Sequence, residues 1–173
     1  MKLAAFAFAL FSCLAHAREN AQVEVAFTPG DDIEGLIVRE IARARTTIQV
    51  QAYLFTDRHV ATALVGALRR GVAVEVIGDA TQQESGGLPV LARLRKAGAR
   101  VYLDGELAAS HNKIVILDAG TPRATVITGS YNFTHAAQAR NAENVVLISG
   151  SRAITDRYAS NFEAQRSRSR TWP

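Results

Sequence analysis

Apolar and polar positions along the chain follow two repeating patterns, and the order of these patterns predicts an α/β fold. Short β-branched runs, alternating or fully apolar, predict strands at residues 23–27, 48–55, 72–77, 100–103, 113–117, 124–128 and 143–148. Apolar side chains at three- and four-residue spacing predict helices at residues 33–45, 57–70, 88–96 and 153–165. Because helices separate most of the strands, we expect a mixed, largely parallel β-sheet flanked by helices on both faces.

Between and after these elements, other residues predict a helix cap, a loop and a chain tail. Thr56 stands where the cap of the second helix is expected. Residues 82–89 are polar and glycine-rich, which predicts a loop. Residues 166–170 alternate arginine and serine, and two interpretations of this tail are open. It either contacts phosphates without regard to sequence or forms a frayed, solvated chain end.

The first residues have the pattern of a secretory signal. Lys2 precedes an apolar run over residues 3–14, which ends in a small-x-small sequence. We therefore expect a signal peptide at residues 1–17 and a single mature domain at residues 18–173, in the periplasm or secreted. The alternative is an uncleaved membrane anchor, but the run is shorter than the roughly 20 residues that cross a bilayer. No stable membrane association is expected after cleavage.

Composition narrows the function without deciding it. The chain has 20 basic and 16 acidic residues, a formal net charge of +4 and 48% hydrophobic residues, which suits one domain with a substantial core. This charge balance is compatible with a nucleic-acid partner but excludes a polybasic binder. The single cysteine of the sequence, Cys13, lies in the signal segment. The mature domain can therefore hold neither a disulfide nor a thiolate zinc site.

A histidine and a lysine at the start of the strand predicted at residues 113–117 are the first candidates for chemistry. His111 and Lys113 are two positions apart, so they point the same way along an extended chain, whereas Asp118 points the other way. An ammonium neutralises phosphate oxygens, and an imidazole can attack phosphorus or carry a proton. Taken singly, each residue is more simply a surface or capping residue. Their joint spacing favours a phosphodiester site.

The next two strands add polar groups to the same site. Ser130 and Asn132 follow Gly129 and share one face, where they can donate hydrogen bonds to a phosphate. Alternatively, the glycine, serine and asparagine form a turn without a role in binding. Glu143 opens the strand predicted at residues 143–148. We expect its carboxylate to hold a ring N–H of His111 and fix the tautomer, as an aspartate does in a serine-protease triad.

At these residues the chain resembles the phospholipase D superfamily, whose signature is H-x-K-x4-D followed by G-S-x-x-N or G-S-x-N, and within it the small secreted bacterial endonucleases. Residues 52–56 look like the second strand of that family and residues 141–144 like its glutamate segment. The gap from Asp118 to Gly129 is longer than the family commonly has, which predicts a longer hairpin tip around residues 120–123.

One motif supplies only half of a double-displacement site, because a covalent mechanism needs a nucleophile on one side of phosphorus and a proton donor on the other. Neither His59 nor His135 has a lysine two residues on, and both are interpreted as surface residues at helix starts. A two-fold dimer would bring a second His111 and Lys113 to the phosphate. The resemblance implies the same homodimer, with a phosphohistidine on one His111.

The sequence therefore predicts a metal-independent phosphodiesterase, most simply a nonspecific endonuclease on DNA with RNA as a further candidate substrate. No cofactor is expected, since no carboxylate cluster stands beside His111. The pair Asp104 and Glu106 is interpreted as a solvated turn. Two alternatives remain: a phospholipase D acting on lipid head groups, and a catalytically inactive nucleic-acid-binding domain.

Overall fold

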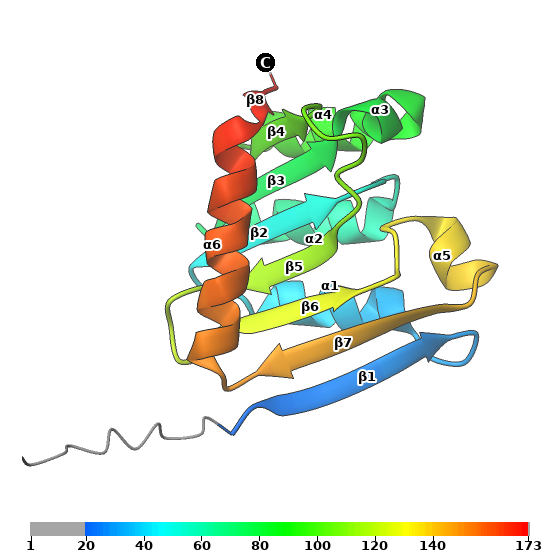
Figure 1. Cartoon of the computed structure of the whole chain (residues 1–173). Coiled ribbons are helices and arrows are strands. Elements are labelled where there is room, and N and C mark those ends of the chain that lie inside the picture. Colours follow the sequence, from blue (N-terminus) through cyan, green and yellow to red (C-terminus); the bar gives the residue numbers. More distant parts are fainter. Residues whose placement is uncertain (1–19, 173) are drawn as a thin grey trace, which may run out of the picture.

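An eight-stranded sheet forms the centre of the molecule. The computed structural model describes residues 20–172, apart from the side chains of residues 84 and 85, so the expected signal peptide lies outside the described residues. Across the sheet the strands follow the order β1-β7-β6-β5-β2-β3-β4-β8 (Figure 1). Their bounds are β1 Gln22–Thr28, β2 Thr47–Ala52, β3 Ala73–Asp79, β4 Arg100–Asp104, β5 Lys113–Leu117, β6 Thr125–Gly129, β7 Glu143–Ser149 and β8 Arg170–Thr171.

The mixed sheet is confirmed, but the expectation that it is largely parallel is wrong. Among the named strands of residues 20–172, only β2–β3 and β3–β4 pair in parallel. The β1–β7, β7–β6, β6–β5, β5–β2 and β4–β8 pairs are antiparallel. A parallel pair needs a crossover that returns the chain to the same end of the sheet, and helices provide it only between β2 and β4. The hairpin connection over residues 118–124 joins β5 to β6, so these strands run in opposite directions.

Helices cover both faces of this sheet. Their bounds are α1 Ile33–Arg43, α2 Arg58–Arg69, α3 Ala80–Gln82, the π-helical turn η1 Gln83–Gly87, α4 Leu88–Lys96, α5 His135–Ala139 and α6 Arg152–Arg168. α1, α2 and α4 share a large apolar core with one face of the sheet. α6 crosses the other face, where Phe162 packs on Ile114 and Ile116 (Figure 1). Among the described residues, no helix combines the length and apolar character needed to cross a membrane.

Local chemistry shifts three predicted boundaries. The cap of α2 is Asp57 rather than Thr56, because its carboxylate accepts from two backbone N–H groups of the first turn. The second strand ends at Ala52, three residues earlier than expected. Residues 82–89, expected as a loop, form helical turns that are interrupted by a kink at Gly86 and lead into α4. The Asp79 carboxylate caps the first of these turns by accepting from Gln82 N.

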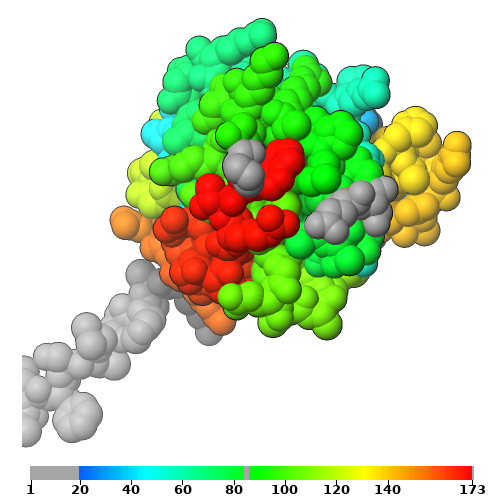
Figure 2. Space-filling model, turned by 90° about the horizontal axis from the view of Figure 1, so that it is seen from above, coloured from blue at the N-terminus to red at the C-terminus, as the bar shows by residue number. Residues whose placement is uncertain are grey.

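The arginine-rich tail is folded onto the sheet, so its interpretation as a frayed chain end is wrong. α6 continues to Arg168, whose guanidinium lies 3.3 Å from the buried carboxylate of Asp104. Beyond it, β8 pairs with β4, and Trp172 N donates to Val101 O at 2.9 Å. In the space-filling view the red end of the chain lies against the green segments around β4 (Figure 2).

Candidate active site

His111 and Lys113 meet where β5 begins. Lys113 is the first residue of β5 and is buried, whereas His111 is exposed. Lys113 Nζ donates to His111 O at 2.8 Å and lies 3.1 Å from His111 Nδ1. Burial lowers the pKa of Lys113, and the carboxylate of Glu143 opposes this shift. The predicted cation and imidazole are thus neighbours, with a carboxylate within electrostatic reach.

Tyr53 contacts His111 and Lys113, although the sequence predicted it only as part of a strand. Its ring centre lies 4.2 Å from that of His111, and Lys113 Nζ lies 4.5 Å from its centroid. Tyr53 follows β2, the antiparallel neighbour of β5, and its N–H donates to Asn112 O at 2.8 Å. Only the pairing of β2 with β5 reveals this contact. The aromatic face supports the ammonium by a cation–π interaction.

Ser130 and Glu143 form a second pair, and this corrects the expected role of the glutamate. Ser130 Oγ donates to Glu143 Oε2 at 2.5 Å, and Asn141 Nδ2 donates to Glu143 Oε1 at 2.9 Å. In the described contacts Glu143 therefore binds Ser130 and Asn141 and not the ring of His111. The cause is the pairing of β6 with β7, which sets these side chains next to each other. Asn132 lies nearby in sequence, with a buried Oδ1 that has no partner in the described part of the chain.

Gly129 allows the backbones of β6 and β7 to come close at this point. A Cβ atom on this residue would lie 2.1 Å from Asn144 O and 2.9 Å from the Cα of Val145. Ser130 N donates to the same Asn144 O at 3.1 Å. The glycine of the motif therefore serves the placement of Ser130 rather than the phosphate itself.

Asp118 lies away from His111, as the parity of the strand predicts. It is buried at a positive φ of 51° and accepts hydrogen bonds from Arg45 N at 2.9 Å, Thr46 N at 2.6 Å and Thr46 Oγ1 at 2.9 Å. Burial alone would raise its pKa, but these hydrogen bonds outweigh burial and the pKa of Asp118 is lowered. The carboxylate fixes the turn between α1 and β2.

We expect Asp118→Asn to lower the free energy of unfolding at pH 7 by about 1–3 kcal/mol, because an amide NH₂ would face backbone donors. A lowered folded-state pKa stabilises the protein above the unfolded value of about 3.9, and this stabilisation is lost as the pH falls through the folded pKa. Urea unfolding at pH 7 and in acid measures both effects. Asp156→Asn, an exposed residue of α6 paired with Arg152, is the control. A stable, dimeric but inactive Asp118→Asn would contradict the structural role.

A buried polar network holds the residue that precedes His111. Ser110 N donates to Asp79 Oδ2 at 2.7 Å, and the Ser110 hydroxyl contacts the side chain of Gln165 on α6. Gln165 Nε2 donates to Asp104 Oδ2 at 3.0 Å. Asp104 is therefore a buried member of this network, and its interpretation as part of a solvated turn is wrong. These partners are far apart in the sequence, so no local pattern predicts them.

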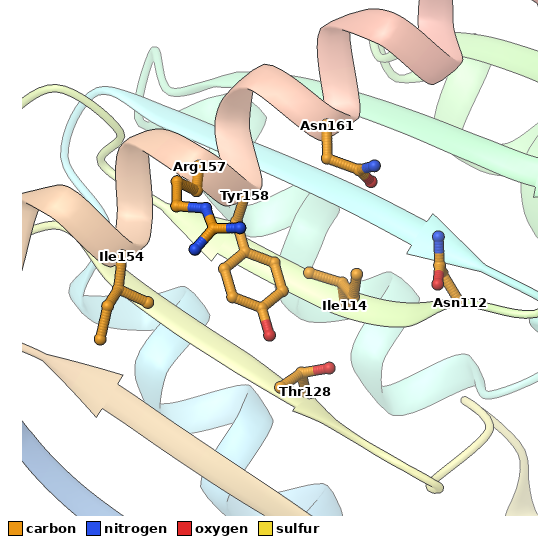
Figure 3. Close-up of a pocket in the computed structure, with 7 residues that line it drawn as sticks. All are labelled: Asn112, Ile114, Thr128, Ile154, Arg157, Tyr158 and Asn161. Carbon is orange, nitrogen blue, oxygen red and sulfur yellow. The ribbon is translucent and has the colours of Figure 1, made fainter.

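A cavity of about 500 Å³ lies beneath α6, on the other side of β5 from Lys113. Figure 3 shows the residues that line it, with side chains from α6 above those of β5 and β6. They are Asn112, Ile114, Thr128, Ile154, Arg157, Tyr158 and Asn161. The cavity thus begins at Asn112, the residue after His111, and continues along the α6 face of the sheet.

Among the described residues, one group of histidine and carboxylate side chains has the spacing of metal ligands. It consists of Glu34, Asp57 and His59. None of the residues proposed for the phosphodiester chemistry belongs to it. The arrangement at His111 is instead an imidazole beside an ammonium, a pair that can attack a phosphate and neutralise its charge.

Comparisons of the sequence give one consistent family. The family model of the cardiolipin synthase, PLD-like domain matches residues 37–166. A phospholipase D from Rickettsia felis is 37% identical over 143 residues, covering 83% of this chain and 68% of that protein. A mitochondrial cardiolipin hydrolase from Mus musculus is 32% identical over 112 residues, covering 65% of this chain and 48% of that protein.

Solved structures agree with the sequence comparison. Nuc from Salmonella typhimurium, a phospholipase D family member, has a TM-score of 0.82 at 28% identity, over 88% of this chain and 99% of Nuc. NucT from Helicobacter pylori has the same fold, with a TM-score of 0.78 at 19% identity over 88% of this chain and all of that chain. With the matched domain model and the His-x-Lys geometry, these findings show that the chain is a phosphodiesterase of the phospholipase D superfamily.

Proposed function

We propose that this protein is a metal-independent endonuclease on DNA, with RNA as a further candidate substrate, and that it works through a phosphohistidine at a site shared by two chains. The observation that carries the proposal is the contact of Lys113 Nζ with His111, within electrostatic reach of Glu143 and its partner Ser130. This set supplies a nucleophile, a cation and a hydroxyl for one phosphodiester.

The reaction has two displacements at phosphorus. A ring nitrogen of one His111 attacks phosphorus, the P–O bond to the leaving group breaks, and the protonated second His111 gives its proton to the leaving oxygen. Water then attacks the phosphohistidine and transfers a proton to the second histidine, the P–N bond breaks, and a phosphate monoester leaves. Lys113 of each chain neutralises the non-bridging oxygens throughout.

The second histidine comes from a homodimer in this proposal, and the α6 face of the sheet has a surface that suits it. Val23, Val25 and Phe27 of β1 are 61%, 55% and 55% exposed. Cross-strand pairing places Val25, Val146, Thr128 and Ile114 on one face, the face that α6 covers in part. The three exposed apolar side chains of β1 make a surface of the kind that is typical of an interface. At the other end of the row, Ile114 lines a cavity together with Asn112, the residue after His111.

The choice of nucleic acid over lipid rests on the endonuclease-like motif and on the fold shared with Nuc over almost its whole length. Lipid phosphodiesters are the second candidate, because relatives above 30% identity are named phospholipase D and cardiolipin hydrolase. Both substrates fit the same chemistry, since the site recognises a phosphodiester and its charge. Residues 1–17 would, on this proposal, act as a cleaved signal that directs the enzyme to the periplasm or the medium.

Two parallel assays in millimolar EDTA test the proposal. We expect supercoiled plasmid to be nicked and linearised at the same rate with and without EDTA, because two lysines replace the metal ion that most nucleases use. Hydrolysis of phosphatidylcholine vesicles by the same preparation is expected to be at background. A strict requirement for Mg²⁺ would contradict the mechanism. Vesicle hydrolysis without plasmid cleavage would establish the lipid alternative, and binding of DNA without cleavage the inactive one.

A further inference from the structure

A second cluster of reactive side chains lies where helices α1 and α2 begin, and the phosphodiester chemistry does not use it. Glu34 is in the first turn of α1, Asp57 is the cap of α2, and His59 follows in its first turn. One ligand atom of each lies within 4.8 Å of the other two. The cluster opens into a cavity of about 280 Å³ that is also lined by Thr56, Arg58 and His135.

Helix capping accounts for only one oxygen of Asp57. Oδ1 accepts from His59 N at 2.8 Å and from Val60 N at 3.0 Å. Oδ2 is buried and has no hydrogen-bond partner among the described residues, and Asp57 as a whole is 4% exposed. A buried carboxylate oxygen without a donor is unfavourable. This atom therefore points to a ligand that the capping role does not provide.

Glu34 adds a second carboxylate at the same place. Its Oε1 lies 2.9 Å from His59 Nδ1. One ligand atom each from Glu34, Asp57 and His59 therefore surrounds a single point, within 4.8 Å of one another. Two carboxylates this close repel each other, and a cation between them would relieve that repulsion.

We propose that Glu34, Asp57 and His59 bind one divalent transition-metal ion, for which Zn²⁺ is the matching probe. One imidazole nitrogen and two carboxylate oxygens are ligands that Zn²⁺ accepts, and three protein ligands leave a position for water. The ion joins the first turns of α1 and α2 and neutralises Asp57 Oδ2. It lies outside the group formed by His111, Lys113 and Tyr53, so it stabilises the fold and takes no part in cleavage.

Titration of the untagged protein tests this site, because a polyhistidine tag would itself bind Zn²⁺. The protein is stripped with EDTA, exchanged into chelator-free buffer and titrated with ZnCl₂ by calorimetry. Thermal unfolding is then followed with and without the ion. We expect one Zn²⁺ per chain and a rise in Tm of about 5 °C or more when free Zn²⁺ is a hundredfold above Kd. Absence of binding, or binding without any change in Tm, refutes the proposal.

Three variants locate the ion. Asp57→Asn keeps an oxygen for the cap and replaces the unpartnered oxygen by an amide; His59→Ala removes an exposed ring and leaves the core intact. Each is expected to weaken Zn²⁺ binding about tenfold or more and to remove most of the rise in Tm. Glu40→Gln, on α1 with Glu34 but paired with Arg43, is the matched control and is expected to bind like wild type. Equal binding by all three variants would place the ion elsewhere and overturn the assignment.

Discussion

Replacement of His111 by alanine is expected to reduce phosphodiester cleavage by about a thousandfold or more, with the fold unchanged. The large loss follows because the imidazole is the attacking group and no neighbouring side chain can replace it. The fold is expected to persist because His111 is exposed and precedes β5 rather than packing within it. Initial rates of plasmid cleavage and circular dichroism measure the two effects.

His135→Ala is the matched control for this variant. His135 is also exposed and also lies at the start of an element, α5, but it has no lysine two residues on. Its removal is expected to leave the cleavage rate within a factor of two of wild type. If His111→Ala lost its secondary structure, or cleaved DNA as fast as the control, the assignment of the nucleophile would be wrong.

A purified heterodimer of wild-type and His111→Ala chains is expected to be nearly inactive. One histidine must attack while the other protonates the leaving oxygen, so a dimer with a single His111 lacks one of the two steps. Two different affinity tags allow the mixed dimer to be isolated, and its rate is compared with that of either homodimer.

The alternative has a different signature. If each chain held a complete site, the mixed dimer would retain about half of the wild-type rate. A heterodimer of wild-type and His135→Ala chains controls for damage during mixing and is expected to be fully active. Elution of the wild-type protein as a monomer that still cleaves DNA would also refute the shared site.

Helices and strands could be predicted from the sequence where the residues of one short segment determine them. The run Lys113–Leu117 is apolar and β-branched, and it forms β5 with the predicted bounds. The direction of each strand was not predictable in the same way, since the antiparallel pairing of β2 with β5 joins segments that are far apart in the chain. The expected share of parallel pairs failed for this reason.

The residues of the candidate site also differ in whether a local motif predicts them or strand pairing brings them together. His111 and Lys113 stand in one short motif, so their contact followed from spacing. Tyr53 enters the site only through the pairing of β2 with β5, and Glu143 prefers Ser130 to His111 because β6 and β7 lie side by side. Contacts between distant segments depend on the assembled sheet, and no local pattern encodes them.

The contact between Gln165 and Ser110 can form only late in the synthesis of the chain. A chain that has been translated through Lys113 already carries the histidine and the lysine, but the side chain that holds the preceding serine is not made until α6 is nearly complete. Domains generally fold as units while they are being made. The nascent chain therefore carries its motif before both supports of Ser110 are present. A message truncated within α6 ahead of Gln165 would encode every motif residue and Asp79, but not the side chain that holds the Ser110 hydroxyl.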